Sequence, residues 1–193
     1  GEQHISSGGT ADDTNISFGG TQIVSSGGES DNTNISSGGT QIVEGGTTSD
    51  TNIRSGGTQV VSSGGTTSDT NISSGGTQVV SSGGTADDTN ISSGGTQIIS
   101  SGGTGSGTDI SSGGTQIVSS GGSTDGTTIS SGGNQNVEGG TATSVIQSIG
   151  GNLNVIVKGD DPTFVSGINA SGIDFQLSSG VAHDFILYSG GWQ

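Results

Sequence analysis

Recurring aspartates are the first residues in this 193-residue sequence that could do chemistry. One column of positions directly precedes the Thr of each Thr-x-Ile phrase: Asp13, Asn32, Asp50, Asp69, Asp88, Gly107 and Gly126. Stacked carboxylates could bind a cation such as Ca²⁺. However, Asn and Gly interrupt the column, and Asp, Asn and Gly share a tolerance of positive φ. We therefore predict a left-handed turn position here, and expect no metal or other cofactor.

The two histidines, His4 and His183, are the next candidates for chemistry. Two His and no Cys are too few for a zinc site. Asp184 follows His183, but sequence neighbours do not make a catalytic dyad, and no activated nucleophile accompanies them. The aspartates recur as a column and not as one distinct pair in a cleft, which sugar-cleaving enzymes require. We therefore predict no catalytic residues and no enzymatic activity.

An internal repeat determines the elements that position these side chains. The phrase TNISSGGTQVVSSGG, residues 70–84, returns along the chain with small changes. Its Thr-x-Ile isoleucine recurs at steps of 19, 18, 19, 19, 19 and 19 residues. The short step falls where VSSGG becomes VEGG at Val43–Gly46, and such deletions collect in turns because buried faces fix strand register. We predict turns at the Ser-Ser-Gly-Gly segments and short strands between them.

Alternation along the strands predicts which side chains point inward. In the TQVV phrase, the first apolar position ends in Asn136, which is easier to place outside, so the second position should face the interior. The predicted core columns are Ile16, Ile35, Ile53, Ile72, Ile91, Ile110 and Ile129, with Val24, Val43, Val61, Val80, Ile99, Val118 and Val137. The same alternation places the glutamines inside, where stacked amides can hydrogen-bond from coil to coil.

These patterns predict an all-β fold, a right-handed parallel β-helix (solenoid) of about ten 19-residue coils. With 42 Gly and 24% hydrophobic residues, the composition argues against a conventional globular core. One buried Ile and one buried Val per coil contribute ~3–6 kcal/mol, which is less than the entropy cost of ordering 19 residues. The backbone ladder and the stacked polar columns must supply the remainder.

The regular cadence changes near Ser144. We predict regular 19-residue repeats over residues 1–143 and an irregular continuation of the β-helix over residues 144–193. Both ends of the sequence resemble the middle of a repeat, so we expect the continuation to be truncated at its C-terminal end. Most of the aromatic residues lie in this second part: Phe164, Phe175, Phe185, Tyr188 and Trp192. A sugar-binding patch is one use for them, and packing in a thicker core is the favoured use.

The charge balance excludes several classes of partner. There are 17 acidic and 2 basic residues, giving a net charge of −15. Nucleic acid and anionic lipid both require Lys and Arg, so neither is an expected partner. No apolar run approaches the ~20 residues of a transmembrane helix, so we expect no direct membrane insertion.

The phrase ISSGGTQxVSSGGTxxDTxI resembles the AIDA-type repeat of self-associating autotransporter adhesins, over roughly residues 1–140 and more loosely beyond. The resemblance implies a passenger segment exported through the outer membrane to the bacterial cell surface. It implies adhesion, auto-aggregation and biofilm formation, and thus a role in virulence. The expected partners are host-cell or bacterial surface receptors and other rods of the same kind.

The resemblance also implies O-glycosylation, with heptose added to turn serines by a dedicated heptosyltransferase. The serines that match are Ser25, Ser26, Ser62, Ser63, Ser81, Ser82, Ser100, Ser101, Ser119 and Ser120. Three hypotheses therefore remain open: a rigid polar rod that binds through its own surface, a glycan-decorated stalk with no binding of its own, and a β-helix that binds or cleaves carbohydrate or binds ice.

Overall fold

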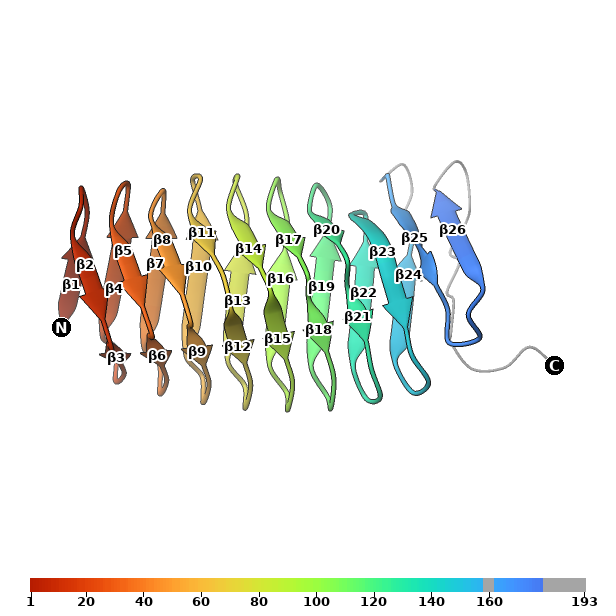
Figure 1. Ribbon diagram of the computed structural model, residues 1–193, viewed down its shortest axis with the longest axis horizontal. Helices are drawn as coiled ribbons and strands as arrows, with labels where there is room; N and C mark the ends of the chain where they lie inside the picture. Colours follow the sequence, from red (N-terminus) through yellow and green to blue (C-terminus); the bar gives the residue numbers. More distant parts are fainter. Residues whose placement is uncertain (158–161, 179–193) are drawn as a thin grey trace.

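The computed structural model describes residues 1–157 and 162–178. In this part of the chain, 26 strands and no helix are found, so no helix could cross a membrane. The strands stack coil upon coil along one axis (Figure 1). The protein is thus an all-β parallel solenoid, as the repeat predicts. The described residues form about nine turns of the ten expected for the whole sequence.

One sheet, here called the long-strand sheet, receives one strand from each coil. Its nine strands are all parallel and follow in order along the rod. They are β1 (Glu2–Ile5), β4 (Thr21–Ser25), β7 (Thr40–Glu44), β10 (Thr58–Ser62), β13 (Thr77–Val80), β16 (Thr96–Ile99), β19 (Thr115–Ser119), β22 (Asn134–Glu138) and β24 (Asn152–Ile156).

The second sheet, the short-strand sheet, has seventeen strands of mostly two or three residues. They are β2 (Thr10–Asp12), β3 (Asn15–Ile16), β5 (Glu29–Asp31), β6 (Asn34–Ile35), β8 (Thr47–Ser49), β9 (Asn52–Ile53), β11 (Thr66–Thr67), β12 (Thr70–Ile72), β14 (Thr85–Asp87), β15 (Thr89–Ile91), β17 (Thr104–Ser106), β18 (Asp109–Ile110), β20 (Ser123–Asp125), β21 (Thr128–Ile129), β23 (Thr141–Gln147), β25 (Phe164–Ile168) and β26 (Asp174–Ser178).

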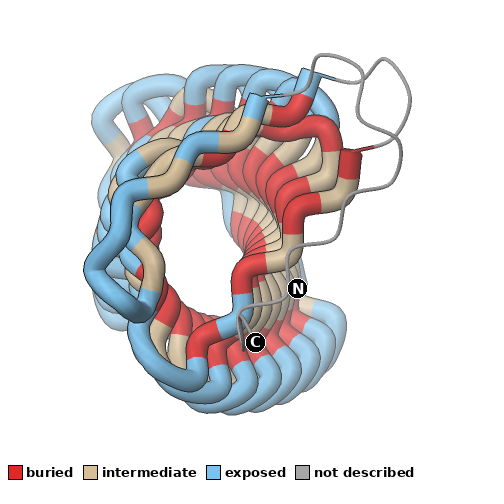
Figure 2. The backbone as a smooth tube through the Cα atoms, turned by 90° about the vertical axis from the view of Figure 1, so that its right-hand side faces the viewer, coloured by how far each residue is buried: buried red, intermediate tan, exposed pale blue. Residues whose placement is uncertain are grey.

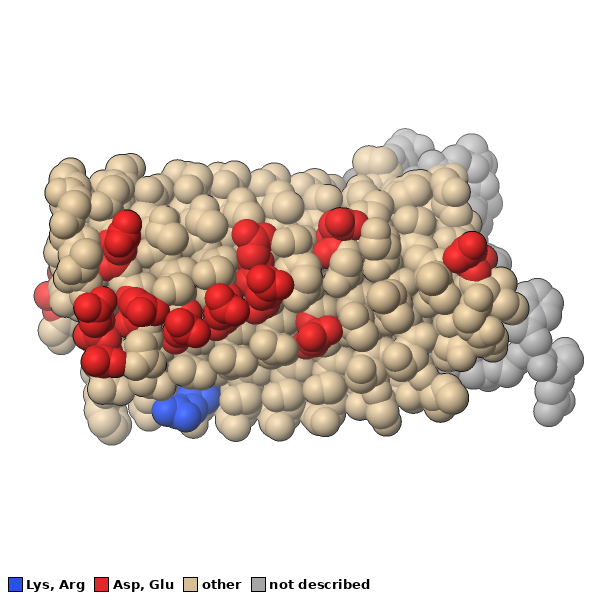
Figure 3. All heavy atoms as spheres, viewed as in Figure 1, with Lys and Arg blue, Asp and Glu red and all other residues tan. Residues whose placement is uncertain are grey.

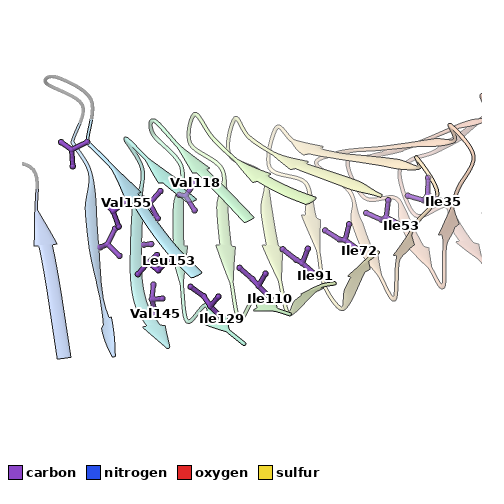
Figure 4. Packing of buried hydrophobic residues seen from close by; sticks show 14 of the residues in the cluster. Ile35, Ile53, Ile72, Ile91, Ile110, Val118, Ile129, Val145, Leu153 and Val155 are labelled. Carbon is purple, nitrogen blue, oxygen red and sulfur yellow. The ribbon is translucent and has the colours of Figure 1, made fainter. Parts of the chain in front are cut away.

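Equivalent residues of consecutive coils are direct strand partners. Ile72 pairs with Ile53 on one side and with Ile91 on the other. Figure 4 shows the resulting row of isoleucines. Both predicted core columns lie inside, where the side chains from Val24 to Val137 are 0% exposed. Each apolar side chain therefore packs on its own counterpart one strand spacing away.

Two kinds of polar column share this interior, which Figure 2 shows as a buried lining inside exposed corners. The glutamines from Gln22 to Gln135 are at most 1% exposed, which confirms their predicted inward orientation. Each side-chain Nε2 donates to the Oε1 of the glutamine one coil earlier, at 2.7 Å from Gln78 to Gln59 and from Gln97 to Gln78. Gln78 also donates to the buried hydroxyls of Thr67 and Thr70. Every amide donates to the glutamine of the preceding coil, so the side chains form one ladder of hydrogen bonds that all run in the same direction.

The two glycines of each turn have different roles. In the turn after β10, Ser63 and Gly64 have φ of 53° and 79°, and Gly65 N donates to Ser62 O at 2.8 Å, as in a type I′ turn. A Cβ on Gly65 would lie 2.3 Å from the carbonyl oxygen of Val43 in the preceding coil. The first glycine therefore supplies the left-handed backbone, and the second lets consecutive coils approach.

The regular pattern ends at β23. This strand pairs with β25 through a register shift between Ala142 and Val145, and β26 then runs antiparallel to β25. Phe175 and Leu177 of β26 are partly buried against the apolar core. Phe185, Tyr188 and Trp192 lie outside the described residues.

Candidate functional site

The serine pairs occupy the corner that follows β4, β10, β13, β16 and β19, whereas the shorter turns after β7 and β22 carry no serine. The first serine of a pair continues the strand and is half-buried: Ser25, Ser62, Ser81, Ser100 and Ser119. The second stands at the tip of the turn and is exposed: Ser26, Ser63, Ser82, Ser101 and Ser120. Backbone bonds tie the tips together, for example Ser63 N to Ser82 O at 3.0 Å. From Ser63 to Ser120 the corner is therefore a column of hydroxyls with one strand spacing between neighbours.

The aspartate column lies in the left-handed region throughout, as predicted from residue type. Asp13, Asp50, Asp69 and Asp88 have φ of 49–52°, and Asn32 has φ of 51°. Asn32 Nδ2 donates to Asp13 Oδ1, so neighbouring side chains in the column contact each other. Within residues 1–157 and 162–178, no three His, Cys, Asp or Glu side chains converge as metal ligands would. The left-handed backbone accounts for the choice of Asp, Asn and Gly at these positions.

Charge is unevenly distributed around the rod. Figure 3 shows the acidic side chains as a band along the face of the short-strand sheet and its corner. Of the described carboxylates, only Glu2, Glu44 and Glu138 belong to long strands. Arg54 is the basic side chain of the described part, and its Nη2 donates to Asn34 Oδ1 at 3.2 Å. One side of the rod is therefore acidic and the opposite sheet nearly uncharged.

Asp125 is the acidic group whose environment changes its proton affinity most clearly. Thr143 Oγ1 donates to its carboxylate at 2.7 Å, and Ser144 donates as well. These bonds favour the charged form and hold the pKa of Asp125 below its ordinary value of 3.8. A depressed pKa stabilises the fold above the unfolded-state pKa, and this contribution is lost as the pH falls through the folded-state pKa.

We expect the carboxyl of Asp125 to titrate by NMR with a midpoint below 3.8, and Thr143→Val to move that midpoint upward, because Thr143 is the largest cause of the shift. Thr128→Val is the matched control, since it removes a threonine hydroxyl from a neighbouring strand without removing this hydrogen bond. A midpoint that Thr143→Val leaves unchanged would show that the shift has another origin.

The structure does not bring the histidines into any catalytic arrangement among the described residues. His4 is exposed on β1, with its Nε2 3.0 Å from Glu2 Oε1, and His183 lies outside the described residues. A shallow hollow of about 410 Å³ lies beside the register shift, lined by Ser144, Ser166, Asp174 and Gln176 among others. Its lining includes one carboxylate, that of Asp174, and no histidine.

Two exposed apolar residues were missed by reasoning from the sequence. Phe18 is 88% exposed and Ile149 is 83% exposed. Both stand at the turn tip that carries serine in the intervening coils, such as Ser74 and Ser93. Phe18 also has a φ of 50°, which is uncommon for a bulky side chain. The sequence signal for Phe18 was the change from ISS to ISF within an otherwise constant phrase.

Comparison with known proteins places these features in context. Residues 70–114 match the family model described as "AIDA: Adhesin of bacterial autotransporter system, probable stalk". The crystal structure of a TibA fragment, hyper-glycosylated by TibC, resembles the chain with a TM-score of 0.52 and 38% sequence identity, covering 84% of this chain and 73% of that one. No curated protein sequence matches the chain.

Proposed function

The chain belongs to the AIDA family of bacterial autotransporter adhesins, and we propose that it is a surface-exposed passenger segment that mediates adhesion, auto-aggregation and biofilm formation. The observation that carries this proposal is the constant register between coils. It repeats similar polar corners along a stiff rod, one strand spacing apart between β10 and β19. Weak contacts repeated in this way add up to strong attachment. The partners we propose are surface receptors on host cells or bacteria, and like rods.

We propose that residues 1–143 form the regular shaft and residues 144–193 its irregular continuation. The register shift in β23 and the antiparallel β26 support this division. The shaft contains every serine pair considered above. Adhesive contacts should therefore lie along the shaft.

A second candidate function is that of a glycan-bearing stalk, favoured by the hyper-glycosylated state of the TibA fragment. We propose that the exposed second serines, for example Ser63, Ser82 and Ser101, accept sugar from a heptosyltransferase, just as the TibA fragment is glycosylated by TibC. Their hydroxyls stand at turn tips, clear of the sheets. On this proposal the attached sugar makes the contact with the receptor, and the rod supplies its spacing.

Displaying the chain on a non-adherent bacterium, with and without co-expressed TibC, tests both candidates. We expect displaying cells to aggregate, form biofilm and attach to epithelial monolayers several-fold more than cells that display an unrelated β-solenoid of equal length. Attachment without TibC supports the bare rod as the adhesin. Attachment only with TibC, together with heptose-sized mass increments on tip serines, supports the glycan. Attachment no greater than the control under both conditions would refute both.

A further inference from the structure

The outer surface of the long-strand sheet differs from the rest of the rod in having almost no charge. Between Glu44 and Glu138, the outward positions of β10, β13, β16 and β19, together with the serines directly after β13 and β16, form three columns, and all of them are half-buried. These three columns, here called the neutral face, are Thr58, Thr77, Thr96 and Thr115; Val60, Val79, Ile98 and Ile117; and Ser62, Ser81, Ser100 and Ser119.

The chemistry of the neutral face suits contact with another flat surface. Its central column consists of β-branched aliphatic side chains, each one partly covered by its neighbours above and below. A column of hydroxyl groups flanks it on each side. Protein–protein interfaces have the same arrangement, with apolar atoms at the centre and hydrogen-bonding groups at the rim.

Charge determines which surface can meet a second copy. Two chains with a net charge of −15 each repel one another. Contact through the short-strand sheet would bring its band of aspartates against a second such band. Contact through the neutral face opposes no carboxylates over four strands and keeps the acidic bands on the outside. Of the two sheets, the long-strand sheet therefore costs less electrostatic free energy to pair with itself.

We propose that the neutral face is the surface on which a second copy of this chain packs. The proposal rests on the proposed function, because it assigns the self-association of the rod to one face. Face-to-face packing buries the Val and Ile column and lets the flanking Thr and Ser hydroxyls bond across the contact.

The size of the neutral face predicts a weak contact. Four strands ~4.8 Å apart and about five residues long have a projected area of roughly 300 Å² per copy. Stable dimers bury about 1,200 Å² or more in total. A rod of this length should therefore associate only at high concentration, and contacts should strengthen as further coils of the same kind are added.

Sedimentation of the purified 193-residue chain tests the proposal, using two variants with equal added charge. Thr77→Glu with Thr96→Glu places two carboxylates on the neutral face. Asn71→Glu with Asn90→Glu places them on exposed positions of the short-strand sheet in adjacent coils. Measurements in 1 M salt, where the Debye length is ~3 Å, remove most long-range repulsion. Circular dichroism checks that every variant is folded.

We expect the wild-type mass to rise with concentration, and to rise more in 1 M than in 0.1 M salt. The neutral-face variant should weaken association at least ~10-fold, because its carboxylates lose water in the contact. The control variant should stay within ~3-fold of wild type. If the charged variant unfolds, Val79→Thr with Ile98→Thr keeps branching at Cβ, removes apolar contact and should still weaken association.

Three results with the purified chain would overturn the proposal. They are a wild-type chain that stays monomeric at millimolar concentration, equal losses of association in the neutral-face and control variants, and binding of the neutral face to microcrystalline cellulose while the chain is monomeric. The cell-display assay separates this from the proposed function. Displayed cells that still aggregate with the neutral-face variant would refute the face and leave the adhesin function standing.

Discussion

Gln78→Leu is expected to lower the free energy of unfolding by about 2–4 kcal/mol, one of the two largest effects anticipated for a single substitution. Leucine has a similar volume, so little cavity forms. The loss comes from hydrogen bonds within the amide ladder. The Oε1 of Gln59 loses the donor at 2.7 Å, and Nε2 of Gln97 loses an acceptor at 2.7 Å. Leaving a buried polar group without a partner costs about 1–3 kcal/mol.

Gln135→Leu is the matched control, because the ladder ends at this residue. The next coil carries Leu153 at the equivalent position, and Oε1 of Gln135 is already buried without a partner. After substitution, Oε1 of Gln116 still accepts from Thr127 at 3.4 Å. We expect a cost below about 1 kcal/mol.

Thermal unfolding and hydrogen exchange measure the difference in stability between the two glutamine variants. Repeat proteins couple mainly to their nearest neighbours. Amides of β10, β13 and β16 should therefore lose protection in the Gln78 variant while distant coils keep theirs. Similar melting temperatures for the two variants would show that the ladder contributes little to stability.

Gly84→Ala is expected to cost about 3 kcal/mol or more. A Cβ at this position would lie 2.3 Å from the carbonyl oxygen and 2.6 Å from the carbonyl carbon of Val61. Both atoms belong to the backbone, so no side-chain rotation can relieve the overlap. The coil must move away, which strains the bond from Ser81 N to Val61 O. Overpacking of this kind typically costs 1–3 kcal/mol, and more where backbone must shift.

Gly83→Ala, one residue earlier, is the control for this substitution. Gly83 has a φ of 81°, and the nearest atom to an added Cβ is Gly64 N at 3.8 Å. Only the left-handed backbone is penalised, at about 1–2 kcal/mol. Chemical denaturation of both variants compares them directly. Equal costs at the two positions would mean that coils can separate slightly without loss, contrary to the close packing described above.

Repetition explains how much of the fold could be predicted. Each position of the shaft can be compared with its counterparts in the same chain, so Asn136 identified the outward column and the Asp, Asn and Gly series identified a left-handed turn. The glutamine ladder followed from alternation alone. These inferences use one physical constraint, the residue-for-residue pairing of parallel coils.

Features that occur once could not be predicted in this way. The register shift between Ala142 and Val145 and the antiparallel β26 have no counterpart in other coils. Their geometry depends on tertiary packing, such as Phe175 against the core, and not on local propensity. The candidate site was predicted only in part, because serine pairs indicate turns but do not show which hydroxyl stands at the tip.

The register between coils also affects how the length of the rod can change. Because every coil meets the next through like residues, deleting or duplicating one whole unit leaves each surviving junction unchanged. A chain with one unit fewer or one unit more should therefore still fold, as a shorter or longer rod. Each unit gained or lost would change the length of the rod by ~4.8 Å.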